Sequence, residues 1–144
     1  KDDWNVAADI WSVTSFTMVA REGNDAERWN MMHPGETPRV PYATECLKST
    51  AGPIIASTDY VRLFAEQIRA YIPEGRSYTV LGTDGFGRSD TRANLRHFFE
   101  IDRYYVTLAA LEALAKTGDI PAETVSEAIE KYRIDREKPN PVDM

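Results

Sequence analysis

The sequence predicts an α/β fold, a small and mostly parallel sheet flanked by helices. Two short apolar runs rich in β-forming residues, 53–57 (PIIAS) and 78–82 (YTVLG), enclose a segment with helical periodicity. Strand, helix and strand within about thirty residues is typical of a βαβ unit, whose two strands are parallel. From residue 91 onward, apolar side chains recur at helical spacing.

Length and composition indicate one globular domain, 1-144. Hydrophobic residues make up 42% of the chain and charged residues 28%, a balance typical of folded proteins. The net charge of −6 argues against a dedicated nucleic-acid binder, which needs a basic face. The single cysteine, Cys46, excludes an internal disulfide, and no apolar run approaches the ~20 residues of a membrane span. We therefore expect a cytoplasmic location.

The first third of the chain predicts a strand, a broken helix and a connector. Residues 6–13 (VAADIWSV) read as a buried strand, and Thr-Ser before Phe16 caps a helix. Gly23-Asn24 is expected to break that helix, so that Asp25 caps a second helical piece. Three prolines within 34–41 predict a connector.

The middle third predicts further helices around the two strands. Residues 42–48 read as a short helix. Thr58 or Asp59 is expected to cap the helix between the strands. One apolar stripe on that helix is predicted to face the core: Tyr60, Leu63, Phe64, Ile68 and Tyr71.

Three helices and a surface tail are predicted after the second strand. The first helix follows Thr91, the second ends before Gly118, and the third starts at Pro121. The polar residues 136–144 are expected to lie over the surface. Only three strands are predicted in total, which is few for a parallel sheet covered on both faces. Either the sheet is very small or an upstream strand is missing.

No self-contained active site is predicted. His33 reads as a helix-terminal residue, His97 as a surface or packed residue, and Cys46 as a small buried hydrophobe. No G-x-S-x-G, H-E-x-x-H or C-x-x-C motif is present. We therefore predict no catalytic, cofactor-binding or metal-binding residues. A small hydrolase built on Asp59 or Asp84 has little support, because capping explains both aspartates.

The loop 82–90 (GTDGFGRSD) is the strongest candidate for binding. It follows a strand and precedes a helix, where backbone N–H groups favour an anion. Its candidate residues for an anion site or a subunit contact are Gly85, Gly87, Arg88 and Ser89. Arg88, Arg92 and Arg96 are expected to share one helical face. Yet no phosphate-binding motif is matched, and glycines with local caps at Asp84, Ser89 and Asp90 equally fit a tight turn.

The same loop carries a family resemblance. The run Gly82-x-Asp84-x-Phe86-Gly87-x-Ser89, followed by a Leu-x-x-x-Phe helix, resembles the C-terminal domain of transketolase-like thiamin diphosphate enzymes. GTDGFGRSD with RANLRHFFEID is similar to the large homodimeric pyruvate dehydrogenases. So are ADIWSVTSF, ERWNMMHPGETPRVPY and ASTDYVRLFAEQIR, and together these segments cover nearly all of the chain.

The resemblance implies a non-catalytic role within an oxidoreductase. In such enzymes pyruvate is decarboxylated on thiamin diphosphate with magnesium, and the acyl group reductively acetylates a lipoyl group of the next component. The cofactor lies between the other domains, at the dimer interface, and the C-terminal domain braces the dimer. This domain also begins with a strand and a helix upstream of Lys1, so 1-144 resembles a fragment trimmed at its N-terminus. Its implied partners are the rest of its chain, a homodimer partner and the lipoyl acetyltransferase component.

A stand-alone module is the alternative function. In that hypothesis the 82–90 loop holds a small anion at the N-terminus of the following helix, with Arg88, Arg92 and Arg96 beside its three glycines. A protein of net negative charge can still concentrate positive potential locally.

Overall fold

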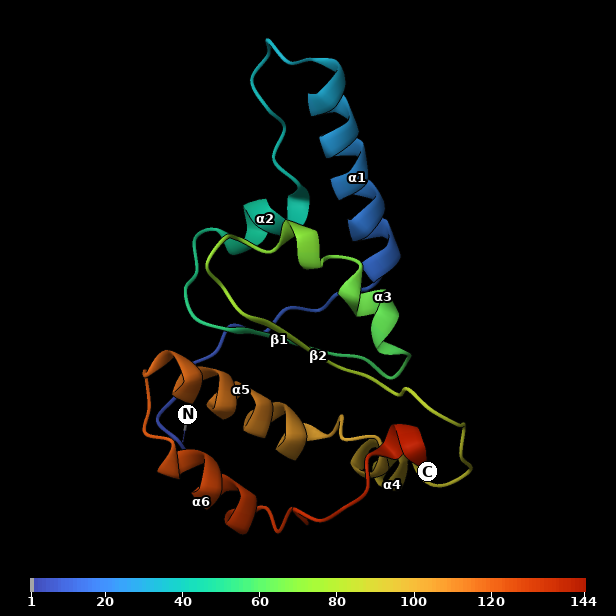
Figure 1. The fold of residues 1–144 in the computed structure, drawn as a ribbon, viewed down its shortest axis with the longest axis vertical. Coiled ribbons are helices and arrows are strands. Elements are labelled where there is room, and N and C mark those ends of the chain that lie inside the picture. Colours follow the sequence, from blue (N-terminus) through green and yellow to red (C-terminus); the bar gives the residue numbers. More distant parts are fainter. Residues whose placement is uncertain (1) are drawn as a thin grey trace.

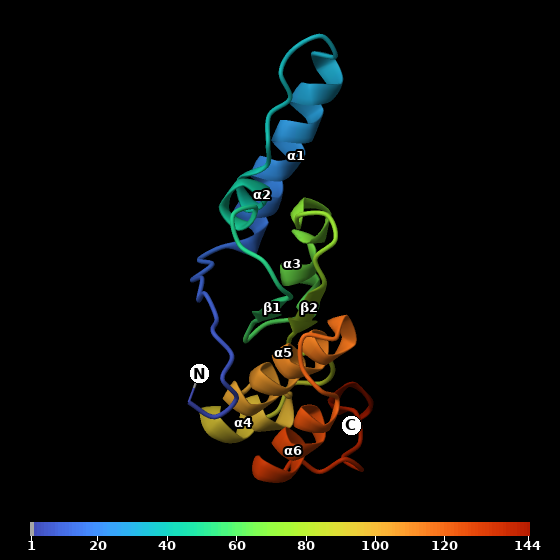
Figure 2. The same ribbon diagram turned by 90° about the vertical axis from the view of Figure 1, so that its left-hand side faces the viewer.

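The computed structural model describes residues 2–144 and shows an α/β fold around a two-stranded parallel sheet. Helices α1 to α3 lie on one side of the sheet and α4 to α6 on the other, in both views (Figures 1 and 2). The predicted fold class is confirmed. No helix within residues 2–144 has the length and apolar character needed to cross a membrane.

The sheet is the predicted βαβ unit. Strand β1 (Ile54–Ser57) pairs in parallel with β2 (Tyr78–Leu81), with Ile54 opposite Tyr78 and Ser57 opposite Leu81. Helix α3 (Arg62–Glu66) and the 3₁₀ turn η1 (Arg69–Tyr71) form the connection. Both strands therefore end at the same edge, and the segments that follow them are neighbours.

The apolar stripe predicted for the connecting helix is wrong in its N-terminal half, where the side chains are exposed and do not face the core. Ile68 and Tyr71 are buried, whereas Tyr60 and Leu63 are more than half exposed and Phe64 is partly exposed. The reason is that the helix starts later, after Val61, and has only five residues before the chain tightens into 3₁₀ geometry. A 3₁₀ turn has three residues per turn, so side chains spaced for a 3.6-residue repeat do not stay on one face across the change from α to 3₁₀ geometry. Neither Thr58 nor Asp59 is its N-cap.

Helix α1 (Phe16–Met32) is continuous, so the break predicted at Gly23-Asn24 and the cap predicted at Asp25 are wrong. Gly23 is buried against the ring of Tyr71, and a Cβ at this position would overlap that ring. The Tyr71 hydroxyl donates a hydrogen bond to Asn24 Oδ1 at 2.7 Å. This glycine serves a close approach of two elements, and does not end the helix. Ser15 is the N-cap, as predicted.

Helix α1 and the connector after it project from the body (Figure 1). Asn30 pairs with the backbone of Arg39, accepting from its N–H at 2.7 Å and donating to its carbonyl at 2.9 Å. The proline-rich connector is thereby held along the helix. Helix α2 (Tyr42–Leu47) follows and matches the predicted short helix.

The core lies between the sheet and α1 and α3. Ala20, Ala65, Ile68 and Val80 are buried together there. The Tyr78 hydroxyl donates to the carbonyl of Ala65 at 2.8 Å. Burial raises the pKa of Tyr78, so this phenol stays neutral and keeps its donor.

Three helices follow β2, as predicted, and on the other side of the sheet α5 packs against β1 and α6 packs against α5. They are α4 (Arg92–Phe98), α5 (Arg103–Thr117) and α6 (Glu123–Lys131). Gly118 ends α5 in the left-handed conformation at φ 80°. The tail ends in a 3₁₀ turn, η2 (Pro141–Asp143). Pro141 is buried, so this end of the polar tail is packed against the body.

Residues 6–13 form no strand, which corrects the third strand of the prediction. Residues 7–14 are all exposed, Ile10 to 96%, and none of 6–14 makes a backbone hydrogen bond within residues 2–144. An apolar, β-forming run becomes a strand only beside another strand. Within the described residues no strand pairs with this one.

Candidate functional site

The strand-end edge of the sheet gathers two carboxylates and two arginines. Asp84 accepts from the backbone N–H of Arg62 at 2.9 Å and from its guanidinium Nε. Asp59 accepts from Arg96 Nε at 3.1 Å and Nη2 at 2.6 Å. These pairs join the segments after β1 and β2 to each other and to α4.

Both carboxylates are held ionised by their partners. The hydrogen bond with Arg96 lowers the pKa of Asp59. Partial burial opposes ionisation of Asp84, but its bonds with the side chain and backbone of Arg62 outweigh that and lower its pKa. A general acid needs a raised carboxyl pKa. This environment therefore gives neither aspartate the character of a general acid.

Two of the loop glycines are required by packing. A Cβ on Gly82 would stand 2.8 Å from the N of Arg62 and 2.8 Å from the carbonyl oxygen of Tyr60. Gly85 has φ 103°, and a Cβ there would stand 2.9 Å from the carbonyl oxygen of Pro141. Around Gly87 the space is open within the described residues. The turn interpretation therefore fits Gly82 and Gly85.

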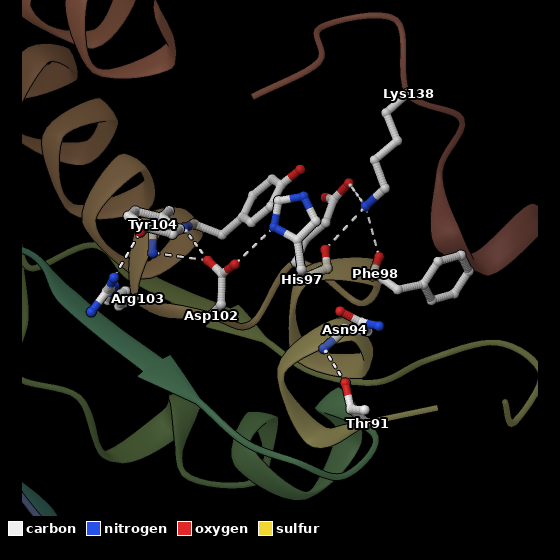
Figure 3. Close-up of polar contacts among 10 residues, drawn as sticks. Thr91, Asn94, His97, Phe98, Asp102, Arg103, Tyr104 and Lys138 are labelled. Carbon is white, nitrogen blue, oxygen red and sulfur yellow. Dashed lines mark hydrogen bonds and ion pairs between the residues drawn. The ribbon is translucent and has the colours of Figure 1, made fainter. Parts of the chain in front are cut away.

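The start of α4 is capped by the chain itself. Asp90 Oδ1 accepts from the Thr91 N–H at 2.6 Å and from Asn94 Nδ2 at 2.8 Å. Thr91 Oγ1 accepts from the Asn94 N–H at 3.3 Å (Figure 3). The hydrogen bonds from Asn94 and Thr91 lower the pKa of Asp90. A carboxylate of the chain thus takes the position where an anion was predicted.

The predicted arginine face does not form. Arg88 precedes α4 and lies in the loop, with its guanidinium carbon 4.1 Å from the centre of the Phe98 ring. Arg96 is engaged by Asp59. Gly85, Gly87, Arg88 and Ser89 are all exposed, and Phe86 between them is 78% exposed. The loop presents an outward surface and no enclosed pocket.

A second polar cluster lies at the other end of α4 (Figure 3). His97 Nδ1 is 2.9 Å from Asp102 Oδ2, and Asp102 Oδ1 caps α5 by accepting from two backbone N–H groups. Lys138, from the tail, donates to the carbonyl of Phe98 at 2.7 Å and to Glu100 Oε1 at 3.0 Å. Sequence reasoning missed Lys138, because a single lysine beside a proline carries no motif.

The remaining candidates stay apart. His33 stacks on Trp29 at the end of α1, with its Nδ1 2.8 Å from the Trp29 carbonyl oxygen. His97 is on α4 and Cys46 on α2. Within residues 2–144, no three His, Cys, Asp or Glu side chains come together as metal ligands would. The geometry supports packing and contact surfaces.

Comparison with known proteins finds a matching family model and several similar relatives. The family model described as the transketolase-like TK C-terminal domain matches residues 1–102. The pyruvate dehydrogenase E1 component of Cupriavidus necator is 63% identical over 142 residues, which are 99% of this chain and 16% of the relative. The E1 component of Escherichia coli K12 is 58% identical over 139 residues, 96% of this chain and 15% of the relative.

A third relative, the E1 component of Pseudomonas aeruginosa, is 57% identical over 143 residues, again 99% of this chain and 16% of the relative. The chain therefore spans about one sixth of the length of these relatives.

Proposed function

The chain belongs to the transketolase-like C-terminal domain family, and we propose that it is the C-terminal domain of a pyruvate dehydrogenase E1 component. The observation that carries the proposal is similarity over 99% of this chain to 16% of a relative of that name. Chains of such different length, alike over the whole of the shorter one, are expected when one domain recurs within a larger protein.

The proposed parent is an oxidoreductase, a cytoplasmic homodimer within a multienzyme complex. It would decarboxylate pyruvate on thiamin diphosphate with magnesium and reductively acetylate the lipoyl group of the acetyltransferase component. This chain would contribute no catalytic residue. Magnesium prefers oxygen ligands, and Asp59 and Asp84 are each bound by an arginine. The residues at the strand-end edge therefore do not fit a diphosphate–magnesium site, which would belong to the rest of the parent.

The stretch 6–13 is proposed to be a strand in the parent, paired with a strand from the part of the protein outside 1-144. Its apolar side chains support this, because Ile10, Trp11 and Val13 are 96%, 54% and 41% exposed. Exposed β-forming runs are aggregation hazards unless another segment pairs with them.

The loop 82–90 is proposed to be a subunit contact. Gly85 to Ser89 are exposed, and Phe86 offers an apolar ring of the kind that interfaces bury. The internal capping by Asp90 and the Arg96–Asp59 pair disfavour the alternative, an anion site.

Calorimetric titration tests the non-catalytic assignment. Thiamin diphosphate with magnesium, added to the 144-residue chain, should give no heat of binding. Micromolar binding would contradict the assignment. In the parent, Arg88→Ala should weaken the dimer more than the chemical step, and a purely kinetic defect would count against the subunit contact.

A phosphate titration followed by NMR tests the alternative. The amide signals of Gly85 to Ser89 should not move at millimolar phosphate. If they shift and saturate, the loop is an anion site and the stand-alone hypothesis gains the stronger position.

A further inference from the structure

We propose that residues 134–144 form a C-terminal strap that positions the 82–90 loop, with Lys138 as the positioning residue. The strap includes the polar tail 136–144, which the sequence predicts to lie over the surface. The inference concerns what holds the loop in place, and it stands whichever partner the loop contacts.

The loop does little to hold itself. Residues 84–89 make no backbone–backbone hydrogen bond within the described part of the chain. Its glycines give the backbone wide conformational freedom, and the whole of 85–90 is exposed. Its conformation must therefore be set by groups from elsewhere in the fold.

Lys138 anchors the strap to the end of α4. Its Nζ donates to the carbonyls of His97 and Phe98, at 3.3 and 2.7 Å, and to Glu100 Oε1 at 3.0 Å (Figure 3). Only 17% of this side chain is exposed. A cation is favoured at a helix C-terminus, where carbonyls lack partners. Bonds from a charged donor are also stronger than neutral ones, so this is a firm attachment.

The strap then touches the loop backbone directly. Pro141 is buried, and its carbonyl oxygen lies where a Cβ on Gly85 would approach it to 2.9 Å. The Cα of Val142 would lie 3.1 Å from the same Cβ. Asn140 starts the final turn by accepting from the Val142 N–H at 3.1 Å. Loop and strap thus fit each other only because residue 85 is glycine.

A shared aromatic ring makes the second link. Arg88, from the loop, lies 4.1 Å from the centre of the Phe98 ring, and Lys138, from the strap, lies 5.5 Å from it. Cations near an aromatic face are attracted to it, more strongly where water is excluded. Releasing Lys138 frees the strap and removes one neighbour of this ring, so residues 85–89 lose the support of the strap while the Asp84–Arg62 pair still holds the start of the loop.

Limited tryptic proteolysis and hydrogen exchange on the protein at its native length test the strap. Lys138→Met keeps the apolar stem and removes the charge, and it should speed cleavage after the exposed Arg88 about tenfold or more, while the amides of α5 stay protected from exchange. Lys138→Arg should restore much of the protection. Lys116→Met is the matched control, because Lys116 makes an exposed pair with Glu112 on the outside of α5, and it should leave the loop unchanged.

Two outcomes overturn the proposal. One is unchanged cleavage after Arg88 in Lys138→Met. The other is faster hydrogen exchange across α5 together with faster cleavage of the loop, since that would mean a general loss of stability and no positioning role.

A second pair of variants tests the same contact from the loop side. Gly85→Ala should release the strap, seen as faster exchange of residues 136–144. Gly87→Ala, at a position with open space around it, should leave the strap protected. A strap that stays protected in Gly85→Ala would refute the contact even if Lys138→Met fails to fold.

Discussion

The two ends of the chain are both attached to the body, but the C-terminal end is held by residues that other segments cover, whereas much of the N-terminal end is exposed. At the N-terminal end, the indole N–H of Trp4 donates to the Tyr132 hydroxyl at 2.6 Å, and Asp3 pairs with Lys131. Beyond that attachment, residues 7–14 are exposed. At the C-terminal end, Lys138 and Pro141 are covered by α4 and the 82–90 loop.

This difference distinguishes the C-terminal strap, which supports the fold from within, from the N-terminal stretch, which presents an exposed surface. Burying apolar groups and pairing polar ones stabilises an element wherever the partners lie. The strap has its partners within the chain, so its loss should already be measurable in the isolated 144-residue chain. The exposed stretch, named the bare stretch 6–14, lacks such partners within residues 2–144. Substitutions in it should therefore lower stability only in a larger assembly.

The largest expected effect comes from the core beneath α5. Leu111, on α5, is 1% exposed, and α5 packs against both β1 and α6. Leu111→Ala should lower the free energy of unfolding by about 2–5 kcal/mol through lost burial and a cavity. Urea denaturation measures it. The half-buried Leu108 is the control, and an equal loss in Leu108→Ala would contradict the packing described.

An intermediate effect is expected at the N-terminal attachment. Trp4→Phe keeps an aromatic ring and removes the N–H donor to Tyr132, so it should cost about 0.5–1.5 kcal/mol of unfolding free energy. Trp11→Phe, on the bare stretch, should cost nothing measurable. If both variants behave alike in urea denaturation, the attachment at Trp4 contributes no stability.

A smaller effect is expected on acidification. The folded-state pKa of Asp84 is depressed by Arg62, so its stabilising contribution is present above the unfolded carboxyl pKa and is lost as the pH falls through that value toward the folded one. When the pH is lowered past about 4, the temperature of the thermal unfolding midpoint should therefore decrease. The decrease should be less steep in Asp84→Asn. Asp9→Asn, on the bare stretch, should keep the wild-type profile. Identical profiles for all three proteins would contradict the pairing.

The smallest expected effect in the isolated chain is at Ile10. Because its side chain is 96% exposed, Ile10→Ser should change the unfolding free energy of the 144-residue chain by less than about 0.5 kcal/mol. In the native-length protein the same change should be clearly destabilising, since the proposed strand would be buried there. A large loss in the isolated chain would place Ile10 inside its core.

Local signals predicted most of the fold. The parallel β1–β2 pair, the Ser15 cap of α1 and the Gly118 end of α5 each rest on residues next to the feature they specify. The errors occurred where a distant residue decides. Gly23 has the composition of a helix break, but its role depends on Tyr71, 48 positions later.

The candidate loop shows the same division. Capping of α4 by Thr91 and Asp90 follows from side chains adjacent in the sequence. The pairing of Asp84 with Arg62, and the approach of Pro141 to Gly85, depend on how separate segments come together. The stretch 6–13 has strand composition without a strand partner in residues 2–144, and composition alone does not specify pairing.

The central claim is that this chain is one domain of a much longer E1-type protein, and the intact mass of the protein purified from its native cell tests it most directly. The account predicts a chain roughly six times longer than 144 residues, since such relatives are matched over 15–16% of their length. A native chain of about 144 residues would contradict it, and the exposed 82–90 loop would then have to be a binding site in its own right.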